Sequence, residues 1–549
     1  MPKPAPRPAP ALSPAAAPRP TPAWAPLSGA TLLRSAALTA LLGLLAGPAW
    51  ADPAPRGTAE ILQEVAGRAT PILLLLVVVG VVISTLPKVR GVEHSAAFVR
   101  RRVLNWLPLG VTYAFLYMAR YNLEVAKGAF SGMRDAAGEA LMQNADFGVI
   151  FGAGTVVYGI SFVINGPLTD RFGGKKAILT AAAGAGLTNL LMGFGAIQLR
   201  DHGVAYDFLS QNLILLYALL YSLNMYFQSF GAVAVVKANA PWFHLKERGV
   251  FGAIFGILIS LGVYFAFDVG RMVLELSSVP WVFLVPATLL GLMLVVVTLV
   301  VENSPAEAGL GELDTGDATD DGPRLGAVAV FQQMLRNPVV VTIALVEFCS
   351  GFMRQAIMQW FRTFARQTDA ALHLKSSYVY DNWGMLLCCA GILGGVVAGV
   401  ISDRLFQSRR GPVAALLYGV MLVGALLLCF VYQVPAAVGI LVLVLSTAVI
   451  GVHGMLSGTA SMDFGGRRNV GVAVGIIDGF VYLGTGVMSF SYAIALPAEQ
   501  LAADGSFTGP ATDPASWIWW PALMVPVSAL GFALTLRLWN ARAKPGAAH

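Results

Sequence analysis

The sequence predicts an all-α polytopic membrane protein, with twelve transmembrane helices in two six-helix halves and one extra transmembrane helix before them. The chain has 549 residues, of which 56% are hydrophobic and only 12% are charged, whereas a soluble domain carries about 25% charged residues. Its apolar residues gather in runs that approach or exceed the roughly 20 residues needed to span a bilayer. The net charge of +6 comes from lysines and arginines in short loops, where they set membrane orientation and do not indicate nucleic-acid binding.

The amino-terminal residues 1–51 are predicted to be a Pro- and Ala-rich leader that ends in a signal peptide. The apolar stretch LLRSAALTALLGLLAGPAWADP contains a small-x-small site, Ala49-Trp50-Ala51; an uncleaved anchor is the alternative. Residues 52–103 hold the extra transmembrane helix, TPILLLLVVVGVVISTLP, and a basic connector. Because basic residues favour the cytoplasm, the main bundle is expected to begin on that side.

Twelve apolar segments follow the connector, six in residues 104–302 and six in residues 338–549. Residues 303–337 are acidic and Gly-rich without apolar period, and they are expected to form a cytoplasmic linker between the halves. Basic and neutral loops alternate, which places both ends of the twelve-helix unit in the cytoplasm. The segments lie near 104–125, 145–168, 175–197, 209–236, 247–270, 280–302, 338–364, 380–402, 412–432, 436–460, 469–494 and 516–538.

Each half carries an arginine deep within an apolar stretch. Arg120 lies in LPLGVTYAFLYMARYN and Arg354 lies in VVVTIALVEFCSGFMRQAIMQWF. Such a cation costs roughly 3 kcal/mol to insert, so it normally faces a cavity and has a partner. Asp170 of GPLTDR follows Arg120 by 50 residues, and Asp403 of GVISDR follows Arg354 by 49. This repetition predicts a duplicated protein in which one cation from each half points at a shared site.

Two guanidinium groups are well suited to a phosphate monoester. The planar fork of arginine offers paired donors and stays charged at any working pH, and two such charges match a dianion. At an effective dielectric constant near 20, one contact at about 4 Å is worth about 4 kcal/mol. A bound anion would therefore offset much of the cost of closing the cavity, while the empty carrier would resist closure. This predicts obligatory exchange, with fast counterflow and slow net uniport.

Acidic groups in the apolar segments allow two other readings of the site. Glu347, Asp478 and Asp381 could form internal salt bridges with the arginines. Glu347 and Asp478 could instead couple transport to protons, because intramembrane acids often act as relays. His453 could be a titrating switch, or a hydrogen-bonded packing residue.

No catalytic constellation appears in the sequence, so neither an enzyme nor a cofactor or metal site is expected. The chain has no nucleophile elbow, no metal-spaced His/Cys cluster and no Gly loop of the kind that cradles phosphate. The four cysteines all lie within apolar segments and are predicted to be small buried hydrophobic residues: Cys349, Cys388, Cys389 and Cys429.

Several segments resemble a known family of transporters. GPLTDRFGGKK at 166–176 resembles the signature loop between helices two and three of the major facilitator superfamily, and GVISDR at 399–404 is its second-half echo. More narrowly, YMARYN, PWFHLKERG, SPAEAGL and NPVVV with FMRQAIMQWF resemble the organophosphate:phosphate antiporters, which include the glycerol-3-phosphate and hexose-phosphate carriers. The likeness covers about 104–540 and implies transport by alternating access.

The resemblance implies which residues bind the substrate. In that family one arginine of helix one and one of helix seven grip the phosphate, at the places of Arg120 and Arg354. The other implied residues of the site are Tyr113, Tyr117, Tyr158, Gln228 and Tyr482.

The chain departs from the family pattern at three positions. Phe162 stands where those carriers have a lysine on helix two. An aliphatic run near Ile259 replaces a histidine on helix five, and Gly351 replaces a tyrosine on helix seven. Fewer cations and one titratable group less put the usual substrate and antiport itself in question.

The two DR motifs, Asp170 with Arg171 and Asp403 with Arg404, lie at helix ends on the cytoplasmic side. They are expected to act in gating, as charge pairs that latch one closed state.

The predicted function is secondary active transport of a small phosphorylated or anionic organic solute across the cell (inner) membrane, in exchange for phosphate. A proton-coupled symporter of an anionic metabolite is one alternative. A membrane sensor that binds a sugar phosphate without transporting it is the other. The expected partners are the solute, phosphate and the lipid bilayer, but no nucleic acid. The protein is expected to be a monomer, with a further partner conceivable at the extra helix.

Overall fold

The computed structural model describes eight stretches of the chain, and the predicted leader, signal peptide and extra transmembrane helix lie outside them. The described residues are 94–135, 138–244, 248–315, 331–332, 335–406, 409–456, 461–502 and 506–540.

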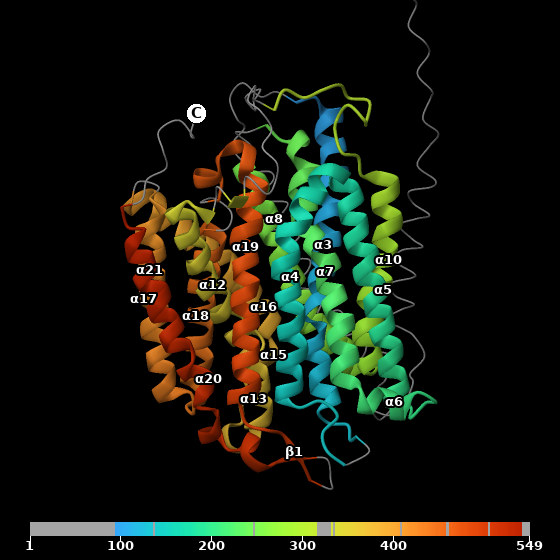
Figure 1. Cartoon of the computed structure of the whole chain (residues 1–549), viewed down its shortest axis with the longest axis vertical. Coiled ribbons are helices and arrows are strands. Elements are labelled where there is room, and N and C mark those ends of the chain that lie inside the picture. The colour runs from blue at the N-terminus through green and yellow to red at the C-terminus, as the bar shows by residue number, and fades with distance from the viewer. Residues whose placement is uncertain are drawn as a thin grey trace, which may run out of the picture. The chain divides into compact units, whose positions relative to one another are not determined.

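The first half consists of long helices that run back and forth, and each predicted apolar segment coincides with one helix or with consecutive helices (Figure 1). Helix α3 begins at Ala96, so Arg100 to Arg102 belong to its first turns and not to a connector. The helices of this half are α3 (Ala96–Phe130), α4 (Asn144–Phe172), α5 (Gly174–Arg200), α6 (Tyr206–Gln211), α7 (Leu213–Asn239), α8 (Arg248–Tyr264), the π-helical turn η3 (Phe265–Val269), α9 (Gly270–Leu276) and α10 (Val279–Val300).

The second half repeats this arrangement and adds short helices and a two-stranded hairpin. These extra elements lie between the long helices, at the end of the bundle where Figure 1 labels α13 and β1. The elements are α12 (Pro338–Met358), α13 (Phe361–Gln367), α14 (Asp369–Leu372), α15 (Tyr378–Asp381), α16 (Trp383–Leu405), α17 (Arg410–Val431), α18 (Pro435–Met455), α19 (Ser461–Ala495), β1 (Gln500–Leu501), β2 (Phe507–Thr508), α20 (Trp519–Ala522) and α21 (Met524–Arg537).

The helix boundaries follow local sequence signals. The Ser95 side chain accepts a hydrogen bond from the amide of Phe98 at the start of α3, and Asn337 caps α12 just before Pro338. Both arrangements satisfy amide groups that have no partner inside a helix. Gly173, with φ of 86°, reverses the chain between α4 and α5 in a conformation that glycine adopts without strain. These signals explain why the apolar segments begin and end close to their predicted places.

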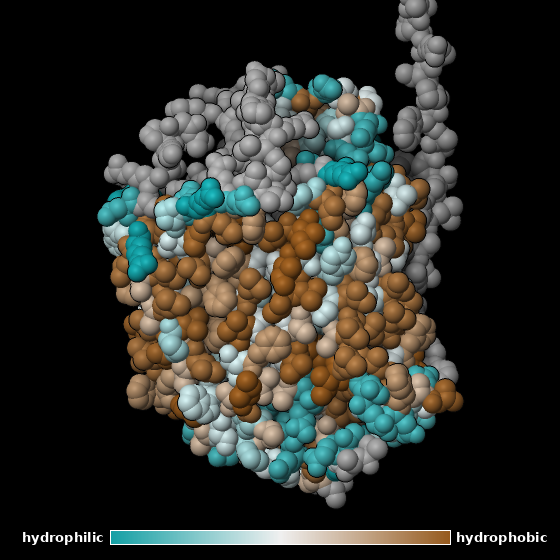
Figure 2. Space-filling view, viewed as in Figure 1, coloured by the Kyte–Doolittle hydropathy of each residue, from teal (hydrophilic) through white to brown (hydrophobic). Residues whose placement is uncertain are grey.

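The bundle has the surface of a membrane protein. Figure 2 shows a band of hydrophobic side chains between two polar ends. Within the described part of the chain, ten helices or helical runs are long and apolar enough to cross a membrane. The long helices α3 and α19, each of 35 residues, complete the set of twelve segments. The predicted all-α membrane fold is therefore confirmed.

The two ends of the bundle differ in charge. The end with Lys175 and Lys176 also carries Arg404 and Arg537, and we call it the basic end. The opposite end, with α6, α13 and β1, is called the outer end (Figure 1). By the positive-inside rule the basic end faces the cytoplasm.

Glycines allow the two halves to approach closely along α4 and α19. A Cβ atom on Gly159 would lie 2.7 Å from the carbonyl oxygen of Gly479, and one on Gly479 would lie 2.9 Å from that of Gly159. Small residues permit such backbone contact in lipid, where packing between helices replaces the hydrophobic effect as the driving force. The helix that carries Tyr158 therefore lies directly beside the helix that carries Tyr482.

The expectation that all four cysteines are buried is wrong for two of them. Cys349 and Cys388 are buried, whereas Cys429 is half-buried and Cys389 is exposed on α16. The exposed thiol lies in an apolar helix whose outer face is covered by hydrophobic side chains such as Leu393 and Val396. Sequence patterns could not separate it from Cys388 because helix rotation decides which neighbour faces the bundle.

Candidate functional site

Arg120 is completely buried at the centre of the bundle, and side chains from three other helices hold its guanidinium group. Nε donates to Oε1 of Gln228 at 2.9 Å, Nη1 to the hydroxyl of Tyr482 at 2.6 Å and Nη2 to the hydroxyl of Tyr158 at 3.1 Å. The ring of Tyr117 lies 4.6 Å from the guanidinium carbon, close enough for a cation–π contact. Tyr482 belongs to the second half, so this bond joins the two halves.

A chain of buried amide side chains supports Arg120 from behind. Gln228 donates to Asn224 at 2.9 Å, Asn189 donates to Asn224 at 3.3 Å, and Asn122 donates to Asn189 at 2.7 Å. Asn189, Asn224 and Gln228 each both donate and accept, which fixes the orientation of their amide groups and leaves Oε1 of Gln228 for the guanidinium group. This network orients the arginine toward the interface between the halves.

Arg354, in contrast, makes no hydrogen bond or ion pair with any residue that the structure describes. Its side chain is only 8% exposed, and its Nε atom is buried without a partner. Its electrostatic neighbours include Tyr117, Tyr121 and Tyr482. A buried guanidinium group with unused donors is costly unless an acceptor arrives, so this atom can receive a ligand.

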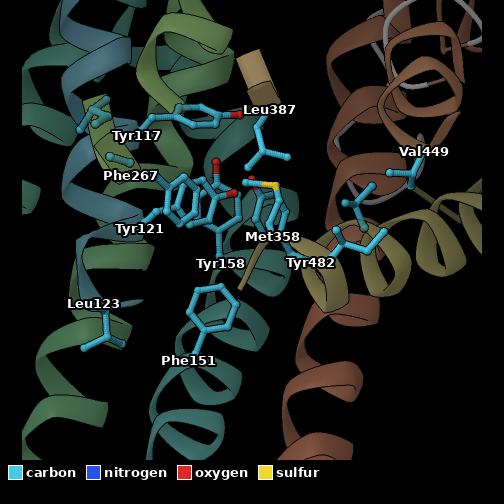
Figure 3. Packing of buried hydrophobic residues seen from close by; sticks show 14 of the residues in the cluster. Tyr117, Tyr121, Leu123, Phe151, Tyr158, Phe267, Met358, Leu387, Val449 and Tyr482 are labelled. Atoms are coloured by element: carbon cyan, nitrogen blue, oxygen red, sulfur yellow. The ribbon is translucent and has the colours of Figure 1, made fainter. Parts of the chain in front are cut away.

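The two arginines share their tyrosine neighbours. Tyr117 and Tyr482 interact electrostatically with both guanidinium groups. Figure 3 shows Tyr117, Tyr121, Tyr158 and Tyr482 grouped at the centre of the bundle, and the rings of Tyr158 and Tyr482 are 4.1 Å apart. The structure therefore brings residues of both halves to one aromatic, cationic centre.

All seven residues implied as substrate ligands lie at this centre, although their role remains a prediction. Tyr113 packs edge-on against Tyr117, with ring centroids 5.3 Å apart, and it interacts electrostatically with Arg120. Gln355 and Tyr121, which sequence analysis did not select, belong to the same group because Gln355 donates to the Tyr121 hydroxyl at 3.0 Å. Tyr121 directly follows Arg120 in the sequence and Gln355 directly follows Arg354. Adjacency to a predicted ligand was therefore the signal that could have identified them.

The proposed internal salt bridges to the arginines fail for two of the three acids. Glu347 pairs with Nδ1 of His453 at 3.0 Å, and Asp381 pairs with Arg271 at 3.1 Å. Glu347 lies seven residues before Arg354 on α12, about 10.5 Å along the axis, which is too far for a direct pair. Asp478 is half-buried and interacts electrostatically with Tyr113.

His453 therefore has a partner that the sequence did not predict. It lies on α18, its side chain is 23% exposed, and Glu347 beside it is fully buried with Oε1 lacking a hydrogen-bond partner. The imidazole ring and the buried carboxylate thus form one hydrogen-bonded pair that joins α12 and α18.

The departure at Gly351 has a structural cause. A Cβ atom there would collide with the carbonyl oxygen of Val481 on α19. The backbone of α19 thus occupies the space that a tyrosine side chain would need. At the other departure on helix two, Phe162 is buried and packs on Tyr158, with ring centroids 5.2 Å apart.

The predicted latch remains a prediction. The side chains of Asp170 and Asp403 lie outside the described part of the structure, while Arg171 and Arg404 are exposed at the basic end.

A second group of charges was missed. Glu124 and Lys127 lie on α3, four and seven residues after Arg120, and Arg362 and Arg366 lie on α13. Glu499 follows α19 and is paired with Lys127 at 3.2 Å. The charges that follow each central arginine in the sequence were a usable signal.

The sequence model described as Major Facilitator Superfamily matches residues 103–489. The glycerol-3-phosphate transporter of Bacillus subtilis is 24% identical over 408 residues, covering 71% of this chain and 85% of that protein. The membrane sensor protein UhpC of Salmonella typhimurium is 24% identical, with 74% and 87% covered. A probable hexose phosphate transport protein of Chlamydia pneumoniae is 21% identical, with 81% and 92% covered.

Solved structures share the fold. A bacterial homologue of the human lysosomal transporter Spinster, in an inward-facing and unoccupied conformation, superposes with a TM-score of 0.57 at 13% identity, covering 81% of this chain and 98% of that chain. A D-xylose–proton symporter superposes with a TM-score of 0.55 at 14% identity, covering 83% and 99%.

Proposed function

This chain belongs to the major facilitator superfamily and is a multi-pass membrane transporter, and we propose that its cargo is a small phosphorylated or otherwise anionic organic solute, taken in exchange for phosphate. The relatives support the class of cargo, because they include proteins named as glycerol-3-phosphate and hexose phosphate carriers. The membership also means that the protein is not an enzyme.

The observation that carries the proposal is the unpaired guanidinium group of Arg354 opposite Arg120. Arg120 already has three hydrogen bonds, to Gln228, Tyr482 and Tyr158, whereas Arg354 has none within the described residues. An anion that reaches this centre would meet unused donors on Arg354 first. It would then compete with the Tyr482 hydroxyl for Arg120, because both acceptors approach the same guanidinium edge.

Exchange follows from the charge of the empty site. Two like charges that share tyrosine neighbours resist closer approach when no anion lies between them. An anion on both guanidinium groups removes that repulsion and lets the halves rock around the site. Return of the carrier without cargo should therefore be slow, which makes counterflow faster than net flux.

The test uses purified protein in liposomes loaded with phosphate. Uptake of a panel of phosphate esters is measured with and without a pH gradient. Exchange is supported by counterflow that requires internal phosphate and does not respond to the gradient. The proposal fails if no phosphate ester exchanges with phosphate, or if uptake proceeds at full rate into phosphate-free liposomes.

The hydrogen-bonded pair Glu347–His453 favours a second candidate, proton-coupled symport. The pair lies on the basic side of Arg354, with its carboxylate buried and its imidazole partly exposed. Uptake driven by an inward proton gradient, and lost in Glu347→Gln, would support symport over exchange.

The relative named as a membrane sensor favours a third candidate, binding of a sugar phosphate without transport. Binding with no flux in the liposome assay would support it. We further propose that the protein is a monomer in the cell membrane, and that the extra amino-terminal helix predicted from the sequence, which lies outside the described residues, contacts a partner.

A further inference from the structure

A second group of charges, all buried except the half-buried Arg366, lies between the two halves on the outer side of the central arginines. It consists of Lys127 and Glu124 on α3, Arg362 and Arg366 on α13, and Glu499 in the segment before β1. Glu124 and Lys127 follow Arg120 by four and seven residues, so they lie about 6 and 10.5 Å further along the α3 axis.

Lys127 and Glu499 form an ion pair across the halves, with N–O distance 3.2 Å and no solvent exposure on either side chain. Asn144 and Gln367 enclose the pair: Lys127 donates to Asn144, Gln367 donates to Glu499, and Asn144 donates to Gln367 at 3.0 Å. Asn144 also donates to the carbonyl oxygen of Pro497 at 2.8 Å. These bonds join the two halves on the outer side of the central arginines.

The arginines of α13 are poorly satisfied by comparison. Nε and Nη2 of Arg366 are buried without a hydrogen-bond partner in the described part of the chain. Arg362 makes one long hydrogen bond within the described residues, from Nη1 to the carbonyl oxygen of Phe267 at 3.4 Å. Both guanidinium groups interact electrostatically with Glu124.

Gly128 makes the room that Arg366 occupies. A Cβ atom on Gly128 would collide with Nη1 of Arg366, so the guanidinium group lies directly against the α3 backbone, next to Lys127. Lys127 and Arg366 also interact electrostatically. Two cations side by side in a buried place need anionic compensation.

Three cations face two buried carboxylates in this group, and Asp146 near the start of α4 also interacts electrostatically with Lys127. Nε and Nη2 of Arg366 nevertheless remain unused among the described residues. We propose that Lys127, Arg362 and Arg366 form a second anion site, through which the phosphate-type cargo passes between the outer side and the Arg120–Arg354 centre. Glu124 and Glu499 occupy these cations in the closed state, in the place that the anion takes when the path is open. The site rests on the proposed function, because it serves the same cargo.

The site gives the outer path a direction-specific role. An anion arriving from outside exchanges places with Glu499 on Lys127, which breaks the bond between the halves. Arg362 and Arg366 then hold the anion until it reaches Arg354. An anion arriving from the basic end reaches Arg354 without meeting these cations.

Phosphate self-exchange measured from each side separately tests the site. Radiolabelled phosphate is supplied to right-side-out or to inside-out vesicles, and its half-saturating concentration is determined on each face. Arg366→Gln should raise the value on the outer face by about tenfold, since a hydrogen bond to a charged group is lost, and should leave the inner value within about twofold. The outer half-saturating concentration of Arg366→Lys should lie between those of the unaltered protein and Arg366→Gln, because lysine keeps the charge but not the planar pair of donors.

Gly128→Ala provides a variant that keeps every charge. The added methyl group pushes the Arg366 guanidinium aside, and the outer value should again rise several-fold. Arg200→Gln is the matched control, because Arg200 lies near the same end in a surface pair with Asp201, and it should change neither value. Should Arg366→Gln fail to fold, Gly128→Ala decides the outcome.

The outer site is overturned, while the proposed function stands, if the half-saturating phosphate concentration rises equally on both faces. It is also overturned if that concentration does not rise on the outer face in either variant. Absence of phosphate exchange in the unaltered protein overturns the proposed function and the site with it.

Discussion

Removal of Arg354 should weaken anion binding without weakening the fold, whereas removal of Arg120 should weaken both. Arg120→Gln deletes hydrogen bonds to Gln228, Tyr482 and Tyr158. At about 1 kcal/mol net for each bond, the loss of unfolding free energy is about 3 kcal/mol. Arg354→Gln deletes no hydrogen bond among the described residues and removes a buried, unpaired cation. Its unfolding free energy should therefore stay within about 1 kcal/mol of the parent or rise.

The effect on phosphate binding should not follow the effect on unfolding free energy, because Arg354→Gln keeps its stability but loses phosphate affinity. A hydrogen bond to a charged group contributes about 1.5–3 kcal/mol, so Arg354→Gln should weaken phosphate roughly 10- to 150-fold. Thermal unfolding in detergent, with and without phosphate, measures both quantities on one sample. Phosphate at about 100 times its dissociation constant adds about 2.7 kcal/mol to the parent protein. That increment should fall to about 0.3–1.4 kcal/mol in Arg354→Gln at the same phosphate concentration.

Two results would refute this reasoning. One is a loss of stability in Arg354→Gln as large as that in Arg120→Gln, which would mean that Arg354 has structural partners. The other is a full phosphate increment in Arg354→Gln, which would mean that the anion binds elsewhere. Arg354→Lys is the matched control, since it keeps the charge and should retain part of the increment.

Three further predictions concern the surroundings of the site. Tyr482→Phe removes the 2.6 Å bond from Arg120, and chemical denaturation should show a loss of about 1 kcal/mol; an unchanged midpoint would count against a real bond between the halves. Gly484→Ala drives a Cβ atom into the carbonyl oxygen of Phe348 and should cost about 1–3 kcal/mol of unfolding free energy, while Gly256→Ala, which meets nothing within 4 Å, should be neutral in the same melt. Glu347→Gln should leave phosphate counterflow unchanged at every imposed pH gradient, and a variant that loses gradient-driven uptake would point to symport.

Sequence patterns predicted the parts of this protein that depend on neighbouring residues. Apolar runs of sufficient length must become helices in a bilayer, because each backbone amide needs a partner that lipid cannot supply. Arg120 and Arg354 stood out for the same reason, since an isolated cation within an apolar run is anomalous whatever the fold around it. The twofold repetition of cation and DR motif could be read directly along the chain.

Pairing between side chains was decided by the tertiary structure. Arg120 contacts Tyr482, which is 362 residues away, and Lys127 contacts Glu499, which is 372 residues away. Hydropathy says which segments span the membrane but not how far each helix is rotated or which neighbour it meets. For this reason Glu347 could be named only as one candidate partner of the arginines, whereas it pairs with His453, and the charges beyond Arg120 were overlooked. Only the packed bundle shows that the described residues satisfy the guanidinium group of Arg120 but not that of Arg354. The difference arises because helices that are far apart in the sequence pack against each other.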